Sequence, residues 1–295
     1  MSYTLDLSFS PAVPRPRMFE HFAARKFYKE LARDLVAYEH PDTGVCFLVK
    51  LRRGRNALLQ QTVVAAEFEI AWGRPRYFGV EAETELSAFV ATFRPRIFDS
   101  QMHGMGEGPY SGEGFLKGWN FGNVFSIGGA LPRLAEFGVE TMPADVVRAV
   151  WAWNYRRPER SETYERSAYV PGIGFVSIDG RLGRAAVWPH GRPVVLPKVE
   201  IVLIGRLVGG ERRYGAARWP EVLDVVRRAG FDVTQDPLDI RFLVPPAPIV
   251  EWADKMHMVD ENALGKIMLH KVLEDDLVAA ARESRETWRT STNPA

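Results

Sequence analysis

The sequence predicts an α+β protein with a mostly antiparallel sheet, helices packed on one side of it, and two subdomains. Three observations lead to this prediction. Residues 63–72 alternate polar and apolar side chains with period two, which is typical of a half-buried strand. After a break at Gly73-Arg74-Pro75, apolar residues recur at helical spacing over 78–93. Beyond residue 166 the composition changes to short β-branched runs separated by glycine-containing turns.

The N-terminal half contains further patterns of both kinds. Aspartate and glycine in the turn at 41–44 favour a hairpin over 38–51, and Ser111 is a suitable helix N-cap. The glycines at 112, 114, 118 and 122 weaken the helix that follows and indicate close backbone approach. The other expected elements are a strand over 3–9, an extended connector over 10–17, a helix over 19–35, a basic surface loop over 52–56, an irregular stretch over 94–110, and helices over 111–125 and 143–155.

The charged segment 156–166 is the expected boundary, which divides the chain into subdomains 1–158 and 159–295. The second subdomain is expected to be built mainly from strands and turns, with two helices. The expected elements are strands over 169–178, 182–188, 199–207 and 240–244, an extended piece over 193–197, turns at Asp179-Gly180 and His190-Gly191, a helix over 219–229 closed by Gly230, a long helix over 260–283, and a fraying end over 284–295.

Composition favours a soluble globular protein. Hydrophobic residues make up 46% of the chain and charged residues 25%, and no apolar run approaches a membrane span. The formal net charge of +1 argues against broad attraction to nucleic acid or to a membrane surface. One cysteine, Cys46, rules out an intramolecular disulfide and lies in an apolar run, where we expect a buried thiol. Without a signal-peptide pattern, the expected location is the reducing cytoplasm.

Motifs for catalysis, cofactors or metals are not found. The glycine-rich stretch 104–114 lacks the Lys-Ser/Thr pair that a phosphate-binding loop requires, because Phe115-Leu116-Lys117 follows it. The six histidines show no metal-binding spacing, although His257 with Asp254 and Asp260, or His103 with Asp99, would form a ligand pair if distant residues joined them. We therefore predict no catalytic motif, no cofactor and no metal site.

Acidic residues gather around the central strand and helix, at positions 67, 69, 81, 83 and 85. Three interpretations remain open. They are solvated faces of a strand and a helix, a pair of carboxylates in a hydrolase, or an acidic surface for a basic partner such as a nuclease toxin.

Three short blocks resemble a known family. Residues 38–47, YEHPDTGVCF, resemble a recurring hairpin with the pattern Y-x-N/H-P-x-T-G-V-x-F. Residues 68–81 and 180–197 are similar to two further blocks of the same family. It comprises mostly uncharacterised bacterial proteins that occur as many divergent paralogues, a distribution similar to that of immunity proteins of toxin systems. Asparagine and an aromatic residue would be expected at positions 40 and 46, where this chain has His40 and Cys46. The family supplies no catalytic residues.

The resemblance implies a non-enzymatic cytoplasmic protein that binds and neutralises a cognate toxin. The predicted contact residues are Arg74, Tyr77, Glu81 and Glu85. The competing hypothesis is a hydrolase with a site assembled by the fold from residues such as Glu67, Asp99, His103 and Glu113. A structural or assembly subunit is a third possibility.

Overall fold

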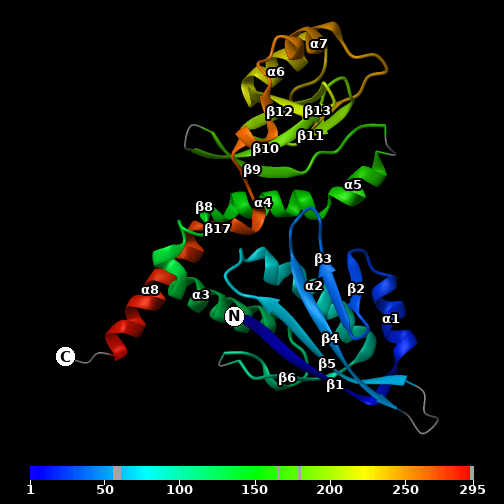
Figure 1. Ribbon diagram of the computed structural model, residues 1–295, viewed down its shortest axis with the longest axis vertical. Coiled ribbons are helices and arrows are strands. Elements are labelled where there is room, and N and C mark those ends of the chain that lie inside the picture. Colours follow the sequence, from blue (N-terminus) through cyan, green and yellow to red (C-terminus); the bar gives the residue numbers. More distant parts are fainter. Residues whose placement is uncertain (56–60, 102, 165–166, 179–180, 293–295) are drawn as a thin grey trace. The chain divides into compact units, whose positions relative to one another are not determined.

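The computed structural model describes residues 1–55, 61–101, 103–164, 167–178 and 181–292, and it confirms the α+β fold (Figure 1). By its internal contacts the chain forms two compact units. Unit 1 comprises Met1–Val147 and His270–Ala295, and unit 2 comprises Arg148–Leu269. None of the helices in the described part of the chain has the combination of length and apolarity needed to cross a lipid bilayer.

Unit 1 is built on a seven-stranded antiparallel sheet with the order β2-β3-β4-β5-β1-β6-β7. Its strands are β1 (Ser2–Pro14), β2 (Tyr28–Ala32), β3 (Leu35–Glu39), β4 (Cys46–Arg55), β5 (Gln61–Ala71), β6 (Arg96–Asp99) and β7 (Gly106–Gly108). Its helical elements are α1 (Arg15–Ala23), α2 (Tyr77–Phe93), α3 (Gly112–Ala130), η1 (Leu131–Arg133) and α8 (Asp275–Thr292). A parallel pair, β8 (Glu140–Met142) with β17 (Val272–Glu274), completes it.

One face of this sheet carries the core. In β1, Tyr3, Leu5, Leu7 and Phe9 are buried, whereas the residues between them point to the other face. The centres of the Tyr3 ring and the Phe115 ring of α3 are 5.4 Å apart, and those of the Phe9 ring and the Phe89 ring of α2 are 6.2 Å apart. Both helices therefore pack on the same side of the sheet, as the alternation in the sequence predicts.

The helices of unit 1 approach closely where they carry glycine. A Cβ added to Gly79 of α2 would lie 2.6 Å from the Trp119 ring of α3, and one added to Gly122 would lie 2.4 Å from Trp72. The expectation that the glycines of this region mark close approach is thus confirmed. Ser111 caps α3 as predicted, accepting a hydrogen bond of 3.1 Å from the Gly114 amide.

Unit 2 is built on a six-stranded sheet with the order β15-β13-β12-β10-β9-β16, antiparallel except for the parallel pair β10 and β12. Its strands are β9 (Ile173–Ile178), β10 (Arg181–Pro189), β12 (Ile201–Val208), β13 (Glu211–Arg218), β15 (Val259–Asp260), β16 (Lys266–Ile267) and a separate pair, β11 (Val194–Leu196) with β14 (Leu238–Ile240). Its helical elements are α5 (Arg157–Thr163), α6 (Trp219–Arg228), α7 (Ala247–Asp254) and η2 (Glu261–Leu264). The units divide within α4 (Ala144–Tyr155), and η3 spans Leu269–Lys271.

The two units differ from the expected subdomains 1–158 and 159–295. The C-terminal segment returns to unit 1, because β17 pairs with β8 and α8 packs on α3 through Leu277 and Ile127. A prediction with a single boundary cannot describe a unit that is built from two separate segments of the chain.

Several local expectations are wrong. The stretch expected to be one helix over 19–35 is the end of α1 followed by β2, and the long helix over 260–283 is replaced by η2, β16, η3, β17 and the start of α8. Residues 52–55 continue β4 rather than forming a loop, the stretch 94–110 contains β6 and β7, and β14 ends at Ile240. β13 was not expected. The turn predicted at Asp179-Gly180 lies outside the described residues.

Candidate functional site

The predicted contact residue Glu81 is an interior group. It is fully buried in α2, where its Oε1 accepts hydrogen bonds from the Tyr38 hydroxyl at 2.9 Å and from Thr43 Oγ1 at 3.1 Å. The Tyr77 hydroxyl, buried as well, donates to the Thr43 carbonyl oxygen at 3.3 Å. These bonds join the start of α2 to the hairpin turn at 41–44. Glu81 and Tyr77 thus stabilise the fold of unit 1.

Glu85, one helical turn further on, is also buried. It accepts a two-point hydrogen bond from Arg25, with Nε at 2.7 Å and a terminal nitrogen at 3.0 Å. Burial, and to a lesser extent the negative charge of Glu85, raise the pKa of the Tyr28 hydroxyl above its usual range. The expectation of an exposed acidic surface on α2 is therefore wrong for these two glutamates, because α1, β2 and the hairpin turn cover this flank of the helix.

Arg74, the fourth predicted residue, lies in the turn before α2. Its guanidinium carbon is 5.7 Å from the centre of the Phe78 ring, and its backbone amide donates to Asn123 Oδ1 at 3.1 Å. The structure therefore brings Tyr77, Glu81 and Glu85 into one region of unit 1, but as parts of its interior.

The residues proposed for a hydrolase have separate partners. Glu67 pairs with Lys50 at 2.9 Å. Asp99 is buried and accepts hydrogen bonds from Tyr3 and from the amides of Gln101 and Met105. The His103 ring packs on Phe121, with 3.8 Å between ring centres, and Glu113 is exposed in the first turn of α3. These contacts do not assemble the four residues into one site.

Two other expectations concern cysteine and metal chemistry. Cys46 is exposed at the start of β4, so the expectation of a buried thiol is wrong. The register explains this: Cys46 lies opposite Glu39 at the end of β3, and the inward positions belong to Val45 and Phe47. Within the described ranges, His, Cys, Asp and Glu nowhere form a group of three able to hold a metal ion.

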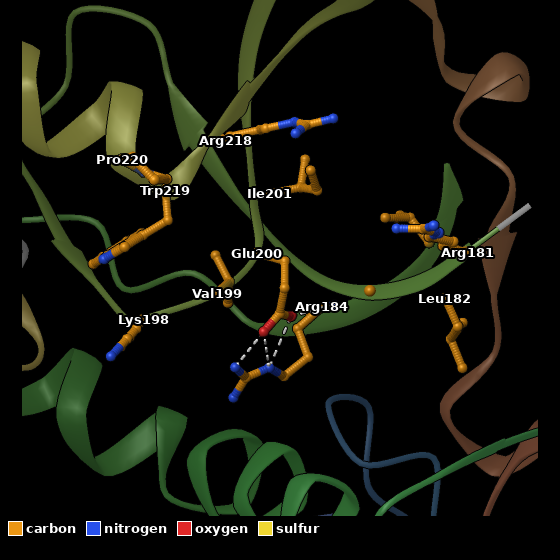
Figure 2. Close-up of a pocket in the computed structure, with 12 residues that line it drawn as sticks. Arg181, Leu182, Arg184, Lys198, Val199, Glu200, Ile201, Arg218, Trp219 and Pro220 are labelled. Atoms are coloured by element: carbon orange, nitrogen blue, oxygen red, sulfur yellow. Dashed lines mark hydrogen bonds and ion pairs between the residues drawn. The ribbon is translucent and has the colours of Figure 1, made fainter. Parts of the chain in front are cut away.

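A large concavity lies within unit 2, with a volume of about 740 Å³. We call it the arginine cleft and define it by Arg181, Arg184, Lys198, Glu200, Arg218 and Trp219 (Figure 2). Its apolar lining includes Val199 and Ile201, from the segment that leads into β12. The volume is within the range of small-molecule pockets.

Strand pairing assembles this cleft from distant parts of the sequence. Ile201 lies opposite Ala185 of β10 on one side and opposite Arg218 of β13 on the other. Because side chains alternate along a strand, Arg181 shares a face of β10 with Ala185, and hence with Ile201 and Arg218. Figure 2 shows the Arg218 side chain extending above Ile201. Trp219 begins α6 directly after β13, with Pro220 at a position that suits a helix start.

The cleft has an excess of positive charge. The guanidinium of Arg184 has a carboxylate partner, Glu200, which it contacts at 2.5 and 3.0 Å. Burial acts to raise the pKa of the Glu200 carboxyl, but the hydrogen bonds from Arg184 outweigh it and hold that pKa below its usual range. Among the described residues, Arg181, Lys198 and Arg218 have no ion pair. The cleft can therefore attract an anionic group.

Sequence reasoning did not identify the arginine cleft. The charges at 181, 184, 198 and 218 are scattered over 38 positions, and they come together only through the order of β10, β12 and β13. Trp219 was expected at the start of a helix but not at a site. In comparisons with known proteins, no family model, curated protein or solved structure matches this chain.

Proposed function

We propose that this protein is a non-enzymatic binding protein of the immunity type, which neutralises a cognate bacterial toxin in the cytoplasm by occluding it. In this proposal the contact surface is the arginine cleft of unit 2, and the partner presents acidic groups to it. The glutamates of α2 take no part in the contact, because they are buried.

The composition of the cleft supports a protein partner. Tryptophan and arginine are the residues most enriched at the energetically dominant positions of protein interfaces. Trp219 is half-buried beside Arg218, so its ring is available at the surface while its position is held by the start of α6. Arginine stacks and forms two-point hydrogen bonds, which suits it to bind a carboxylate group.

The charge pattern supports an acidic partner. Arg181, Lys198 and Arg218 are exposed and have no ion pair among the described residues. Exposed charges of one sign accelerate association with an oppositely charged surface and disfavour wrong partners. The three sequence blocks that resemble a paralogue-rich family favour an inhibitor of the immunity type over other binding proteins.

The test is a co-purification followed by a toxicity assay. The tagged protein is expressed in its native host, and bound proteins are identified by mass spectrometry, with the product of the neighbouring gene as first candidate. The proposal predicts a stoichiometric partner that is toxic when expressed alone and harmless when expressed together with this protein. A partner-free monomer would contradict it and would favour the alternative hydrolase.

A pair of charge-reversal variants then tests the surface. Arg181→Glu/Arg218→Glu is expected to weaken toxin binding at least tenfold, mainly by slowing association. The matched control is Lys117→Glu/Arg282→Glu, which makes the same charge change at exposed positions of α3 and α8 in unit 1. Equal affinity of the two variants would exclude the arginine cleft as the contact surface.

A further inference from the structure

Arg181 and Arg218 stand at the two ends of one groove within the arginine cleft. The pairing of Ala185 with Ile201, and of Ile201 with Arg218, places both arginines on the same face of the sheet. They are two strands apart across the sheet and four residues apart along the strand direction, which separates their Cα atoms by about 16 Å. Figure 2 shows Ile201 between them.

The floor between the two arginines is apolar. Ile201 is half-buried on this face, and the buried Val176 of β9 lies opposite Gly183 of β10. A Cβ added to Gly183 would have one neighbour within 4 Å, the Glu200 Cβ at 3.7 Å, so the groove is open above this glycine. Glycine inside a strand often marks a place where a ligand or another backbone approaches closely. A ligand that lies along the groove therefore meets a cation, an apolar floor and a second cation, in that order.

The charges of the groove suit two separated carboxylates. Arg181 and Arg218 are exposed and have no ion pair in the described part of the chain. The carboxylate of Glu200 is engaged by Arg184, with contacts of 2.5 and 3.0 Å, so it is not available to neutralise either of them. Arginine binds a carboxylate through two parallel hydrogen bonds, which favours one carboxylate for each guanidinium.

An extended peptide matches the length of the groove. Side chains alternate along a strand, so residues i, i+2 and i+4 face the same side and span about 13 Å. Acidic residues at i and i+4 can then reach the two guanidinium groups, while residue i+2 lies over Ile201. In an α-helix, residues i and i+4 are separated by only about 6 Å along the axis, so a helix would present these two acidic groups too close together.

We propose that the arginine cleft binds an extended segment of its partner with the pattern acidic–x–apolar–x–acidic, in which one carboxylate contacts Arg181 and the other contacts Arg218. The apolar side chain packs on Ile201. This inference rests on the function proposed above, because it takes a protein as the ligand. It adds the conformation of the segment that the partner presents and the spacing of its acidic residues.

Isothermal titration calorimetry of the full chain with short peptides, without any toxin, tests the proposal. The probe is acetyl-Asp-Thr-Leu-Thr-Asp-amide. Each of three comparators changes one feature: Asn-Thr-Leu-Thr-Asn removes the charges, Asp-Asp-Leu-Thr-Thr keeps the composition but makes the acids adjacent, and Asp-Thr-Ser-Thr-Asp removes the apolar residue. The probe is expected to bind saturably, and each comparator at least about fivefold more weakly, the effect of losing one exposed ion pair of good geometry.

Two results would overturn the proposal. One is the absence of saturable binding of the probe at millimolar concentration. The other is equal binding of the peptide with adjacent acids, which would mean that the two arginines act at one point or attract charge without regard to spacing.

Matched variants locate the binding. Arg181→Gln and Arg218→Gln, made singly, are each expected to weaken binding of the probe about fivefold. The control, Arg192→Gln/Arg212→Gln, removes two other exposed arginines of unit 2 that have no ion pair within the described ranges, and it should bind the probe as the unmodified chain does. Circular dichroism checks that each variant is folded. An equal loss in the control would show general charge attraction and would overturn the site.

The peptide experiment and the search for a toxin fail separately. Selective binding of the probe, with no toxic partner in the co-purification, would retain this inference about the cleft and reject the immunity function. A toxin whose binding depends on Arg181 and Arg218, together with equal binding of the probe and its comparators, would retain the function and reject the proposed pattern.

Discussion

Asn123 of α3 holds the turn that connects β5 to α2, and its replacement by alanine measures how much this contact stabilises unit 1. The side chain is fully buried. Its Oδ1 accepts hydrogen bonds from the amides of Gly73 at 2.7 Å and Arg74 at 3.1 Å, and its Nδ2 donates to the Arg74 carbonyl oxygen at 2.7 Å. Gly73 has a φ of +73°, a conformation that few residues other than glycine adopt.

The expected loss follows from these three bonds. A buried hydrogen bond contributes about 0.5 to 1.5 kcal/mol net, so the three together contribute roughly 3 kcal/mol. Alanine has a higher helix propensity than asparagine, which returns up to about 0.7 kcal/mol in α3. Asn123→Ala should therefore lower the free energy of unfolding of unit 1 by about 2 to 3 kcal/mol.

Two measurements check this value. Urea unfolding gives the stability, and amide hydrogen exchange at Gly73 and Arg74 reports the turn alone, where at least tenfold faster exchange is expected. The matched control is Asn120→Ala, three residues earlier on α3, whose Oδ1 has no hydrogen-bond partner among the described residues. That variant should change stability by less than about 0.5 kcal/mol. If both variants unfolded at the same urea concentration, the reasoning on Asn123 would be refuted.

Three further predictions concern unit 1. Gly79→Ala should destabilise unit 1 by about 1 to 3 kcal/mol in urea unfolding, because the added Cβ meets the Trp119 ring at 2.6 Å. The control is Gly129→Ala in α3, which should be neutral or stabilising, because its Cβ meets nothing within 4 Å. Destabilisation of both variants would contradict the expected clash at Gly79. Burial, with a smaller contribution from a neighbouring arginine, lowers the pKa of His21. The folded state therefore binds fewer protons, and stability should fall as the pH drops below about 6.5; His21→Gln should show a shallower fall between pH 7.5 and 5.5, and an unchanged slope would refute this. Exposed Cys46 should react with a thiol reagent in the native protein as fast as in urea, and native protection would show that it is covered.

The elements that the sequence predicted well are those determined by interactions between residues close to one another in the chain. The strand β5 and the helix α2 follow from a change of period across Gly73-Arg74-Pro75, and both were found within two residues of their expected limits. The hairpin β3–β4 follows from its turn residues, and the start of α3 from the hydroxyl of Ser111. Each of these signals acts over a few residues, so no knowledge of the rest of the fold is needed.

The long helix expected over 260–283 shows where this reasoning fails. Its apolar residues have helical spacing, but they are buried against different elements. Leu264 packs in the core of unit 2, and Leu273 packs in that of unit 1. Gly265, between η2 and β16, has a φ of +54° and a helix could not continue through it without a break. Apolar spacing alone does not reveal which core receives each side chain.

Glu81 and Glu85 illustrate the same limit at the level of function. The sequence places both off the apolar face of α2, but they are buried, because α1, β2 and the turn at 41–44 cover that flank of the helix. The arginine cleft shows the converse case, a site that the sequence does not predict. Its cations come from strands whose neighbours in the sheet are set by long-range pairing, so the sequence gives their charge and not their proximity.

Burial also changes what the net charge implies. The formal charge of +1 counts all 37 acidic residues, but Glu81, Glu85, Asp99 and Glu274 are buried, and no lysine or arginine is buried in the part of the chain that the structure describes. The charge that faces solvent is therefore more positive than the sequence total. Net charge excludes anionic ligands only when acidic and basic side chains are equally exposed to solvent. Here the acids are used inside unit 1, which leaves the arginines of unit 2 available to bind anions.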